Sequence, residues 1–221
     1  MNPFLSTYKT LFETIPFSKI KNEHYLPALK KGIEIAQSEI QQITSNPDSP
    51  SFENTIEAME KTGEIINKVT SAFFNLNSAN TNDEMQSIAQ GISPLLTAHG
   101  NDIMMNKELF HRIKIVNASG FEGLTKEQKT LLTKTYKSFV RNGANLNDND
   151  KRRLREIDTK KVQLSLTFGE NVLKENNDFK LIINQEKDLT GLPNSVIEAA
   201  SINANNEGHE NKWMFTLDYP S

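Results

Sequence analysis

The sequence of 221 residues contains no cysteine, and this absence excludes several kinds of site. Without thiols the chain has no disulfide bond, no catalytic thiolate and no cysteine-ligated zinc or iron–sulfur centre. A globular chain of this length buries roughly 70% of its unfolded surface. We therefore expect a hydrophobic core, rather than covalent links, to stabilise the fold.

The sequence also lacks a large excess of charge and lacks long apolar runs. Lys and Arg number 25 against 28 Asp and Glu, which gives a formal net charge of −3. Because proteins bind phosphate backbones through an excess of basic residues, this balance argues against a nucleic-acid partner. The apolar runs are far shorter than the ~20 residues that span a bilayer, and the start MNPFLSTYKT lacks the pattern of a signal peptide. We predict binding neither to nucleic acid nor to a membrane.

Most of the sequence carries the periodicity of amphipathic helices. Over residues 26–43, apolar residues recur at steps of three and four, which keeps them on one helical face: Leu26, Leu29, Ile33, Ala36, Ile40 and Ile43. Ser51 is a candidate N-cap for the next helix, predicted over residues 52–76. That helix has two apolar stripes, so we expect it to have neighbours on two sides.

Capping patterns mark the starts of later helices. Thr81 with Glu84, and Thr125 with Gln128, have the spacing of capping boxes. The longest helix is predicted over residues 149–176. Its inward-facing residues are predicted to be Leu154, Ile157, Leu164, Phe168 and Val172.

The last part of the sequence changes character. Residues 179–184 (FKLIIN) and 212–217 (KWMFTL) are rich in β-branched and aromatic residues and predict two strands, with a helix between them over residues 193–206. The predicted fold is mainly α, a multi-helix bundle with long antiparallel helices and a small two-strand β element near the C-terminus. We expect a helical domain over residues 1–177 and a strand–helix–strand segment over 178–221. Because the sequence stops soon after the second strand, we expect that strand to find a partner beyond the last residue.

Histidines are the first candidates for a metal site, and there are four: His24, His99, His111 and His209. His209 and Glu210 begin the zinc motif His-Glu-x-x-His, whose two histidines share one helical face, but Trp213 occupies the second histidine position. His99 lies on the apolar face of its helix. We expect it to be a core imidazole with its polar atoms satisfied, and a functional role is the alternative. The other two are expected to face water from helix surfaces.

A basic cluster precedes the middle of the long helix: Lys151, Arg152, Arg153 and Arg155. It could form an anion-binding patch. However, Asp148 with Arg152, and Glu156 with Lys160, have the i, i+4 spacing of helical ion pairs. We therefore favour a solvated helix face.

Other motifs of catalysis and binding are missing. The sequence has no Gly-x-Ser-x-Gly elbow, no Walker loop and no Gly-x-Gly-x-x-Gly fingerprint. The asparagine-rich stretches 75–83 (NLNSANTND) and 142–149 (NGANLNDN) are expected mainly to cap helices, with polar contacts to another molecule as the alternative. The residues alone predict a helical domain with no catalytic residue and no metal site, and they identify no substrate-binding residue.

Short segments distributed over the whole chain, taken together and in order, give a more specific signal than any single motif. In order they are MNPFL, PFSKIKNEHYLPAL, FENTIEAMEKTGEI, FFNLNSANTNDEMQ, NDIMMNKELFHRI, FVRNGANL, LTFGENVL, LTGLP and NKWMFTL. In this order and spacing they resemble the N-terminal region of the M3 family of zinc metallopeptidases. The resemblance is greatest to the bacterial peptidyl-dipeptidase (dipeptidyl carboxypeptidase) and oligopeptidase A branch. MNPFL and FFNLNSANTNDE favour the dipeptidase.

The resemblance implies a largely helical enzyme with two lobes across a deep channel, and zinc held by His-Glu-x-x-His and a downstream Glu. Those ligands lie outside this sequence, so no catalytic residue is carried over. The implied role is a non-catalytic segment that helps wall the substrate channel and leads into a catalytic domain absent from this chain. Its partners would be that C-terminal catalytic region and short peptide substrates. The intact enzyme would release C-terminal dipeptides, in the cytoplasm or, for a chain whose signal peptide has been removed, in the periplasm.

A freestanding helical interaction module is the competing hypothesis. In that case the asparagine-rich loops would bind another protein, and the domain would be complete with polar outer faces. A reading frame that continues beyond codon 221 to His-Glu-x-x-His would favour the enzyme. A stop codon there would favour the module.

Overall fold

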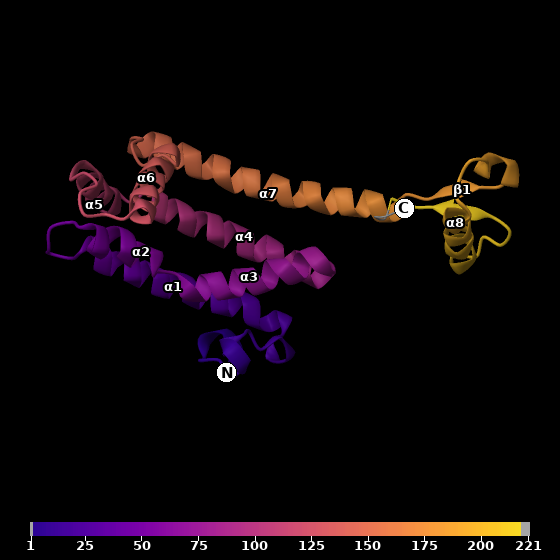
Figure 1. Cartoon of the computed structure of the whole chain (residues 1–221), viewed down its shortest axis with the longest axis horizontal. Helices are drawn as coiled ribbons and strands as arrows, with labels where there is room; N and C mark the ends of the chain where they lie inside the picture. The colour runs from indigo at the N-terminus through magenta and orange to yellow at the C-terminus, as the bar shows by residue number, and fades with distance from the viewer. Residues whose placement is uncertain (1, 218–221) are drawn as a thin grey trace. The chain divides into compact units, whose positions relative to one another are not determined.

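Helices dominate the computed structural model, which describes residues 2–217 (Figure 1). The prediction of a mainly α fold with one small two-stranded sheet is confirmed. No described helix is long and apolar enough to cross a membrane. In chain order the helices are α1 (Asn22–Thr44), α2 (Ala58–Glu60), α3 (Glu64–Ala79), α4 (Asp83–Met104), α5 (Lys107–Ala118), α6 (Lys126–Arg141), α7 (Asp148–Asp178) and α8 (Asn194–Asn206). The strands are β1 (Leu181–Ile183) and β2 (Trp213–Phe215).

The chain divides into two compact units between Leu164 and Ser165, inside α7. The sequence predicts a different domain boundary, after residue 177, which falls near the end of α7. That division into a helical domain and a following segment stays a prediction.

In the first unit, α1 packs against both α3 and α4. The apolar stripe predicted for α1 is largely confirmed, since Leu29, Ala36 and Ile40 are buried. Gly32 lets the two helices approach closely, because a Cβ atom at Gly32 would lie 3.0 Å from Cγ2 of Ile65 in α3. The apolar stripe therefore sets which side of α1 faces the core, and Gly32 allows the close approach to α3.

Aromatic rings connect the N-terminal segment to this core. The ring of Tyr25 in α1 meets that of Phe73 in α3 edge-on, with centroids 5.1 Å apart. Phe4, in the 3₁₀ turn η1 (Pro3–Leu5), packs on Tyr25 at 5.5 Å. Such offset pairs add to the stability gained from apolar burial. They hold the first residues against α1 and α3.

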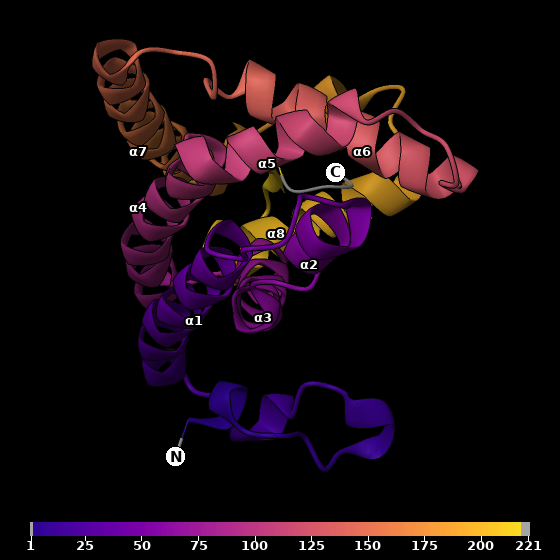
Figure 2. The same cartoon turned by 90° about the vertical axis from the view of Figure 1, so that its left-hand side faces the viewer.

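A second cluster lies where α5 and α6 pack against each other and against the π-helical segment η4 (Phe52–Glu57) (Figure 2). The rings of Phe110 and Phe139 stack nearly parallel, with centroids 5.9 Å apart. Its other buried members are Ile40, Ile43, Phe52, Ile56, Leu109, Ile113, Val116, Leu132 and Ala144. This cluster fixes α5, which carries the polar groups described below.

The single helix predicted over residues 52–76 is wrong, because the structure interrupts it. After η4 and the single turn α2, Gly63 adopts φ +76° and α3 begins afresh. Glycine adopts positive φ without a steric penalty, and its N–H donates to Oε2 of Glu39 at 2.9 Å. The predicted cap is confirmed, since Oγ of Ser51 accepts from the N–H of Asn54 at 3.2 Å. Apolar spacing alone did not reveal the break.

One of the two predicted capping boxes is confirmed. Thr125 and Gln128 bond reciprocally, with each side chain accepting from the other's backbone N–H at 3.3 and 2.9 Å. The prediction of a capping box at Thr81 and Glu84 is wrong. Asn82 caps α4 instead, because its Oδ1 accepts the backbone N–H of Met85. Asparagine is a stronger N-cap than threonine, which explains why the helix starts one residue later.

The long helix α7 is confirmed, but the predicted inward direction of its apolar residues is wrong. Ile157, Leu164, Phe168 and Val172 are all exposed, and Leu154 is half-buried. Leu154 packs near Gly143, in the loop before the helix. Apolar spacing marks the other four as suited to burial, but among the described residues their side chains are exposed.

In the second unit, β1 and β2 pair antiparallel, with Ile182 opposite Met214. The helix α8 packs against β2 and buries Ala200 and Ala204. β1 pairs with one edge of the last strand, so that strand already has a partner inside the sequence, and a further partner beyond it stays a prediction. The chain end from which it was inferred, residues 218–221, lies outside the described residues.

Candidate functional site

The histidines lie in four different surroundings. Nδ1 of His24 accepts the backbone N–H of Lys21 at 3.0 Å, so this side chain caps α1 and is only 19% exposed rather than facing water as predicted. His111 is exposed, as predicted. His209 follows the end of α8, where its N–H donates to the carbonyl of Ala204 at 2.8 Å. Across residues 2–217 no group of three His, Asp or Glu side chains could hold a metal ion.

His99 is buried on the inner face of α4, as its spacing predicts, with 8% of its surface exposed. The expectation that its polar atoms are satisfied is wrong, because Nδ1 has no hydrogen-bond partner among the described residues. Burial lowers the pKa of the imidazole, and the charge of Asp102 opposes this shift only in part. Burial therefore disfavours the protonated form of His99 inside the helical core.

Two members of the basic cluster bind the C-terminal end of α4. The ammonium of Lys151, which is buried, donates to the carbonyl of Met105 at 3.0 Å. The guanidinium of Arg155 donates to Oδ1 of Asp102 at 2.7 Å and to the carbonyl of Asn101 at 3.4 Å. Cations are favourable beside the free carbonyls at a helix C-terminus. These two residues therefore attach α7 to α4.

The ion pairs predicted for this cluster are wrong. Asp148 pairs with Lys107 of α5 at 2.7 Å instead of with Arg152, and Arg153 pairs with Glu156 at 2.8 Å. Arg152 bonds to Asn149. The solvated helix face predicted for the whole cluster holds only for Arg152 and Arg153, which are exposed. The i, i+4 spacing within α7 does not predict the contacts that Asp148, Lys151 and Arg155 make to other helices.

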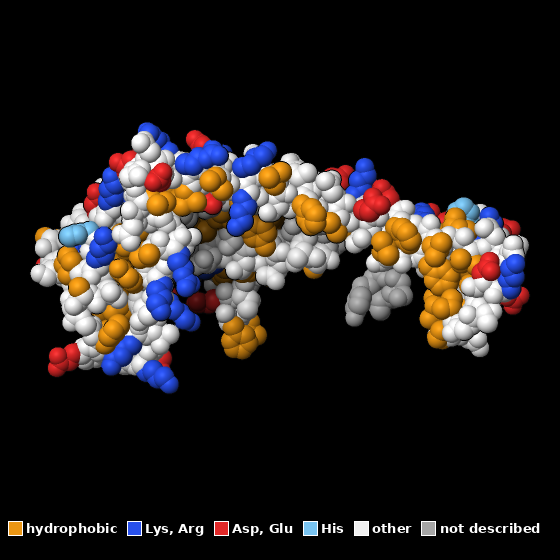
Figure 3. Space-filling view, turned by 90° about the horizontal axis from the view of Figure 1, so that it is seen from above, with side chains coloured by type: hydrophobic (Ala, Val, Ile, Leu, Met, Phe, Trp, Pro, Cys, Tyr) orange, Lys and Arg blue, Asp and Glu red, His pale blue; other side chains and the backbone are white. Residues whose placement is uncertain are grey.

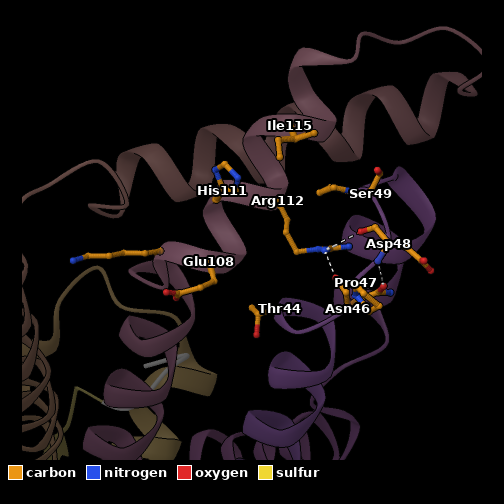
Figure 4. A pocket seen from close by; sticks show the side chains of 11 residues that line it. Thr44, Asn46, Pro47, Asp48, Ser49, Glu108, His111, Arg112 and Ile115 are labelled. Carbon is orange, nitrogen blue, oxygen red and sulfur yellow. Dashed lines mark hydrogen bonds between the residues drawn. The ribbon is translucent and has the colours of Figure 1, made fainter.

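A buried arginine that sequence reasoning missed lies at the wall of a cavity of about 540 Å³ that is open to solvent (Figure 4). Arg112 extends from α5 to the turn after α1 and is 6% exposed. Its guanidinium donates to four neutral oxygens, the carbonyls of Asn46 (2.9 Å) and Asp48 (3.4 Å), Oδ1 of Asn54 (2.9 Å) and Oγ1 of Thr55 (3.3 Å). A signal existed in the sequence, because a charged residue stands three positions after Leu109 and four before Val116, on the apolar side of α5.

These contacts give Arg112 a structural role. Arginine stays protonated at all physiological pH values, so it does not act as a general acid or base. Its donors hold the turn and η4 against α5, and the cavity beside it is lined by Lys107, Glu108 and His111 from the same helix. The arrangement organises the backbone of the turn and of η4 around Arg112.

The asparagine-rich stretches serve the helices, as predicted. The side chains of Asn75 and Asn142 donate to the carbonyls of Ser71 and Ser138, one turn earlier. Oδ1 of Asn147 accepts the first N–H groups of α7. Asn142 and Asn147 act at helix ends, whereas Asn75 lies inside α3 and bonds back within the same helix.

No protein-family model matches this sequence, but individual proteins do. The chain is 36% identical to dipeptidyl carboxypeptidase of Escherichia coli over 98% of its length. It is 30% identical to oligopeptidase A of Haemophilus influenzae over 93% of its length, and 25% identical to oligopeptidase A of Escherichia coli over its whole length. The chain matches the N-terminal region of these peptidases.

The matches cover 32%, 30% and 32% of the three relatives, so the chain spans about a third of the length of the curated relatives it matches. The resemblance inferred from the ordered segments is thereby confirmed. The relatives are named as peptidases, and nothing in their names assigns a role to a residue of this chain.

Proposed function

We propose that this chain is the non-catalytic N-terminal part of a longer M3-type zinc oligopeptidase and helps wall its substrate channel. The observation that carries the proposal is the alignment of nearly the whole chain with about a third of a dipeptidyl carboxypeptidase. The mainly helical fold is consistent with this role. The longer protein would hydrolyse short peptides.

Within residues 2–217 the side chains do not assemble a zinc site. His24 caps a helix, His99 is buried without a ligand set around it, and His111 and His209 lie in separate elements. The proposal therefore places the metal and the catalytic residues in the part of the longer protein outside this chain. No step of the reaction is assigned to a residue described here.

Release of C-terminal dipeptides is the favoured activity of the longer protein. Identity to the dipeptidyl carboxypeptidase of Escherichia coli is 36%, against 25% to the oligopeptidase A of the same organism. The segments MNPFL and FFNLNSANTNDE point in the same direction. The proposed partners are the catalytic region of the same polypeptide and short peptides.

The experiment that tests the proposal starts from the gene. We expect the reading frame to continue past codon 221 to His-Glu-x-x-His and its product to cleave a blocked oligopeptide, releasing a C-terminal dipeptide that mass spectrometry identifies. A stop codon directly after codon 221 would contradict the proposal and favour the freestanding interaction module. A longer product that cleaves only internal bonds would favour the endo-acting oligopeptidase.

A further inference from the structure

Asn142 and Gly143 form the C-terminal cap of α6. The chain leaves the helix at Asn142, which is exposed, and Gly143 has φ +91°. The N–H of Ala144 donates to the carbonyl of Phe139 at 3.0 Å, and the N–H of Gly143 donates to the carbonyl of Val140 at 3.4 Å. These are the two backbone bonds of a Schellman motif, which favours glycine because its φ is positive. The end of α6 therefore places a glycine directly after an exposed asparagine.

An asparagine followed by glycine reacts with its own backbone. The nitrogen of Gly143 attacks Cγ of Asn142, and the bond from Cγ to Nδ2 breaks. Nδ2 leaves as ammonia with the proton that the Gly143 nitrogen gives up. Water then opens the resulting cyclic imide at one of its two carbonyls and leaves aspartate or isoaspartate. The absence of a Cβ atom on Gly143 leaves its nitrogen open to this close approach.

The position is distinguished from neighbouring asparagines by sequence and by bonding. Asn142 is the single asparagine of the sequence that a glycine follows, whereas Asn147 and Asn149 each precede an aspartate. Oδ1 of Asn147 accepts the backbone N–H groups of Asn149 and Asp150 at 3.0 Å each, and its Nδ2 donates to Oδ2 of Asp150 at 2.7 Å. These bonds fix the amide of Asn147, so it is a matched comparison in the same stretch of chain.

Few interactions must break before Asn142 reacts. Its Nδ2 donates to the carbonyl of Ser138 at 2.8 Å. The bond that the Gly143 nitrogen gives up, at 3.4 Å, lies beyond the usual range of about 2.7–3.2 Å, and helix ends open locally at low cost in free energy. The loop between α6 and α7 lies at the top of Figure 1, and Figure 3 shows many charged side chains on that face. Water therefore reaches the site.

We propose that Asn142 is a site of spontaneous deamidation and that its isoaspartyl product loosens the C-terminal cap of α6. Either product replaces the amide by a carboxylate, which does not donate to the carbonyl of Ser138. It also places a negative charge beside the free carbonyls at the end of α6, where the helix dipole disfavours it. The reaction needs only this chain and water, so the inference does not depend on the proposed function.

Isoaspartate has a second effect, on the length of the backbone. In this product the main chain passes through Cβ and Cγ of residue 142, so the path to Gly143 gains a carbon atom. The bond from Ala144 to the carbonyl of Phe139 spans this path. Ala144 and Phe139 are both buried in the cluster that α5, α6 and η4 form. The longer path therefore pulls on a packed part of the first unit.

Incubation of the 221-residue chain at neutral pH tests the reaction. A protease that cleaves after lysine releases residues 138–151, which contain Asn142, Asn147 and Asn149, and mass spectrometry locates the converted residue. Protein isoaspartyl methyltransferase is the probe for isoaspartate. Asn142→Gln is the matched control, because it keeps the amide but requires a larger ring.

We expect Asn142 to convert at least about tenfold faster than Asn147 or Asn149, and Asn142→Gln to remain unmodified at this position. Equal rates at the three asparagines would overturn the proposal. So would an unchanged Asn142 in the chain after the time in which a free peptide of residues 138–151 converts, because the fold would then protect the site.

Hydrogen exchange measures the loosened cap. In the isoaspartyl chain the amide of Ala144 should exchange at least about tenfold faster than in the fresh chain. Asn142→Asp supplies the charge on a backbone of normal length, so it should accelerate this exchange less. Isoaspartyl chains that exchange as slowly as the fresh chain would refute the loosening. An equal acceleration in Asn142→Asp would refute the role of the longer backbone.

Discussion

The guanidinium of Arg112 in α5 donates to Oδ1 of Asn54 in η4 at 2.9 Å. The same amide oxygen accepts the backbone N–H of Ser51 at 2.8 Å, and the Nδ2 group of Asn54 donates to the carbonyl of Ser49 at 3.0 Å. One asparagine thus links the start of the π-helical segment, the turn before it and a buried cation. A segment with irregular backbone is held in place by side-chain bonds from a regular helix.

Replacing Arg112 by methionine tests this arrangement. Arg112→Met keeps much of the side-chain volume but leaves buried oxygens of the turn and of η4 without donors. Hydrogen bonds to charged groups and unpaired buried acceptors each carry costs of about 1–3 kcal/mol. We expect the free energy of unfolding, measured with urea, to fall by about 2–4 kcal/mol. His111→Met, at the exposed neighbouring position, should change it by less than about 0.5 kcal/mol. Equal effects of the two variants would refute the structural role of Arg112.

Gly143, in the loop between α6 and α7, tests the close approach to the long helix. It has φ +91°, and a Cβ atom there would lie 2.8 Å from Cδ2 of Leu154. We expect Gly143→Ala to lower the free energy of unfolding by about 1–2 kcal/mol. Gly91→Ala is the control, because Gly91 lies inside α4 with open space around it. Helix propensity predicts that this variant gains about 0.5–1 kcal/mol. A gain at both positions would contradict the described loop.

His99 should make stability depend on pH. Its pKa in the folded chain is lowered by burial, so the unfolded chain binds the proton more readily. Stability is therefore full above the unfolded pKa of about 6.5 and falls as the pH drops below it. His99→Leu removes this titration and replaces a buried polar ring by an apolar side chain of similar size. We expect it to fold, to change stability modestly at pH 8 and to lose less stability than the wild type between pH 7 and pH 5.

The same variant separates a core role from a catalytic one. In the longer enzyme, His99→Leu should leave the catalytic rate nearly unchanged, because the proposal assigns the chemistry to residues outside this chain. A hundredfold loss of activity in a folded protein would show that His99 takes part in the reaction.

The 221-residue chain alone is expected neither to bind stoichiometric zinc nor to cleave peptides. Its four histidines lie in separate elements, and none is paired with another on one helical face. Metal analysis after dialysis, together with a blocked oligopeptide assay, measures both properties. One tightly bound zinc ion per chain would contradict the expectation.

Most helix positions and the fold class could be predicted from the sequence because they depend on local patterns. The stripe of α1, the cap at Thr125 and the strands around Ile182 and Met214 all follow from spacing and residue type. The roles of Lys151 and Arg112 could not be predicted in the same way. Their partners, Met105 and Asn54, lie 46 and 58 positions away in the sequence, and only tertiary packing brings them together.

The exposed apolar residues of α7 illustrate a different limit. Periodicity correctly identified Ile157, Leu164, Phe168 and Val172 as one apolar face, but it could not say whether the covering element belongs to this chain. The structure leaves the face exposed. An apolar pattern predicts that a residue is suited to burial. It does not identify the element that buries the residue.

Complementation tests the central claim most directly. The 221-residue chain and the remainder of the longer polypeptide are expressed as separate pieces in one cell, and hydrolysis of a blocked oligopeptide is measured after purification through a tag on the chain. We expect the pieces to co-purify and to regain peptidase activity that neither has alone. Trp213, the single tryptophan of the chain, lies half-buried in β2, and its emission should shift to the blue as the pieces join. Pieces that neither associate nor regain activity, with the chain monomeric and unchanged in Trp213 emission, would contradict the account and favour a self-contained interaction module.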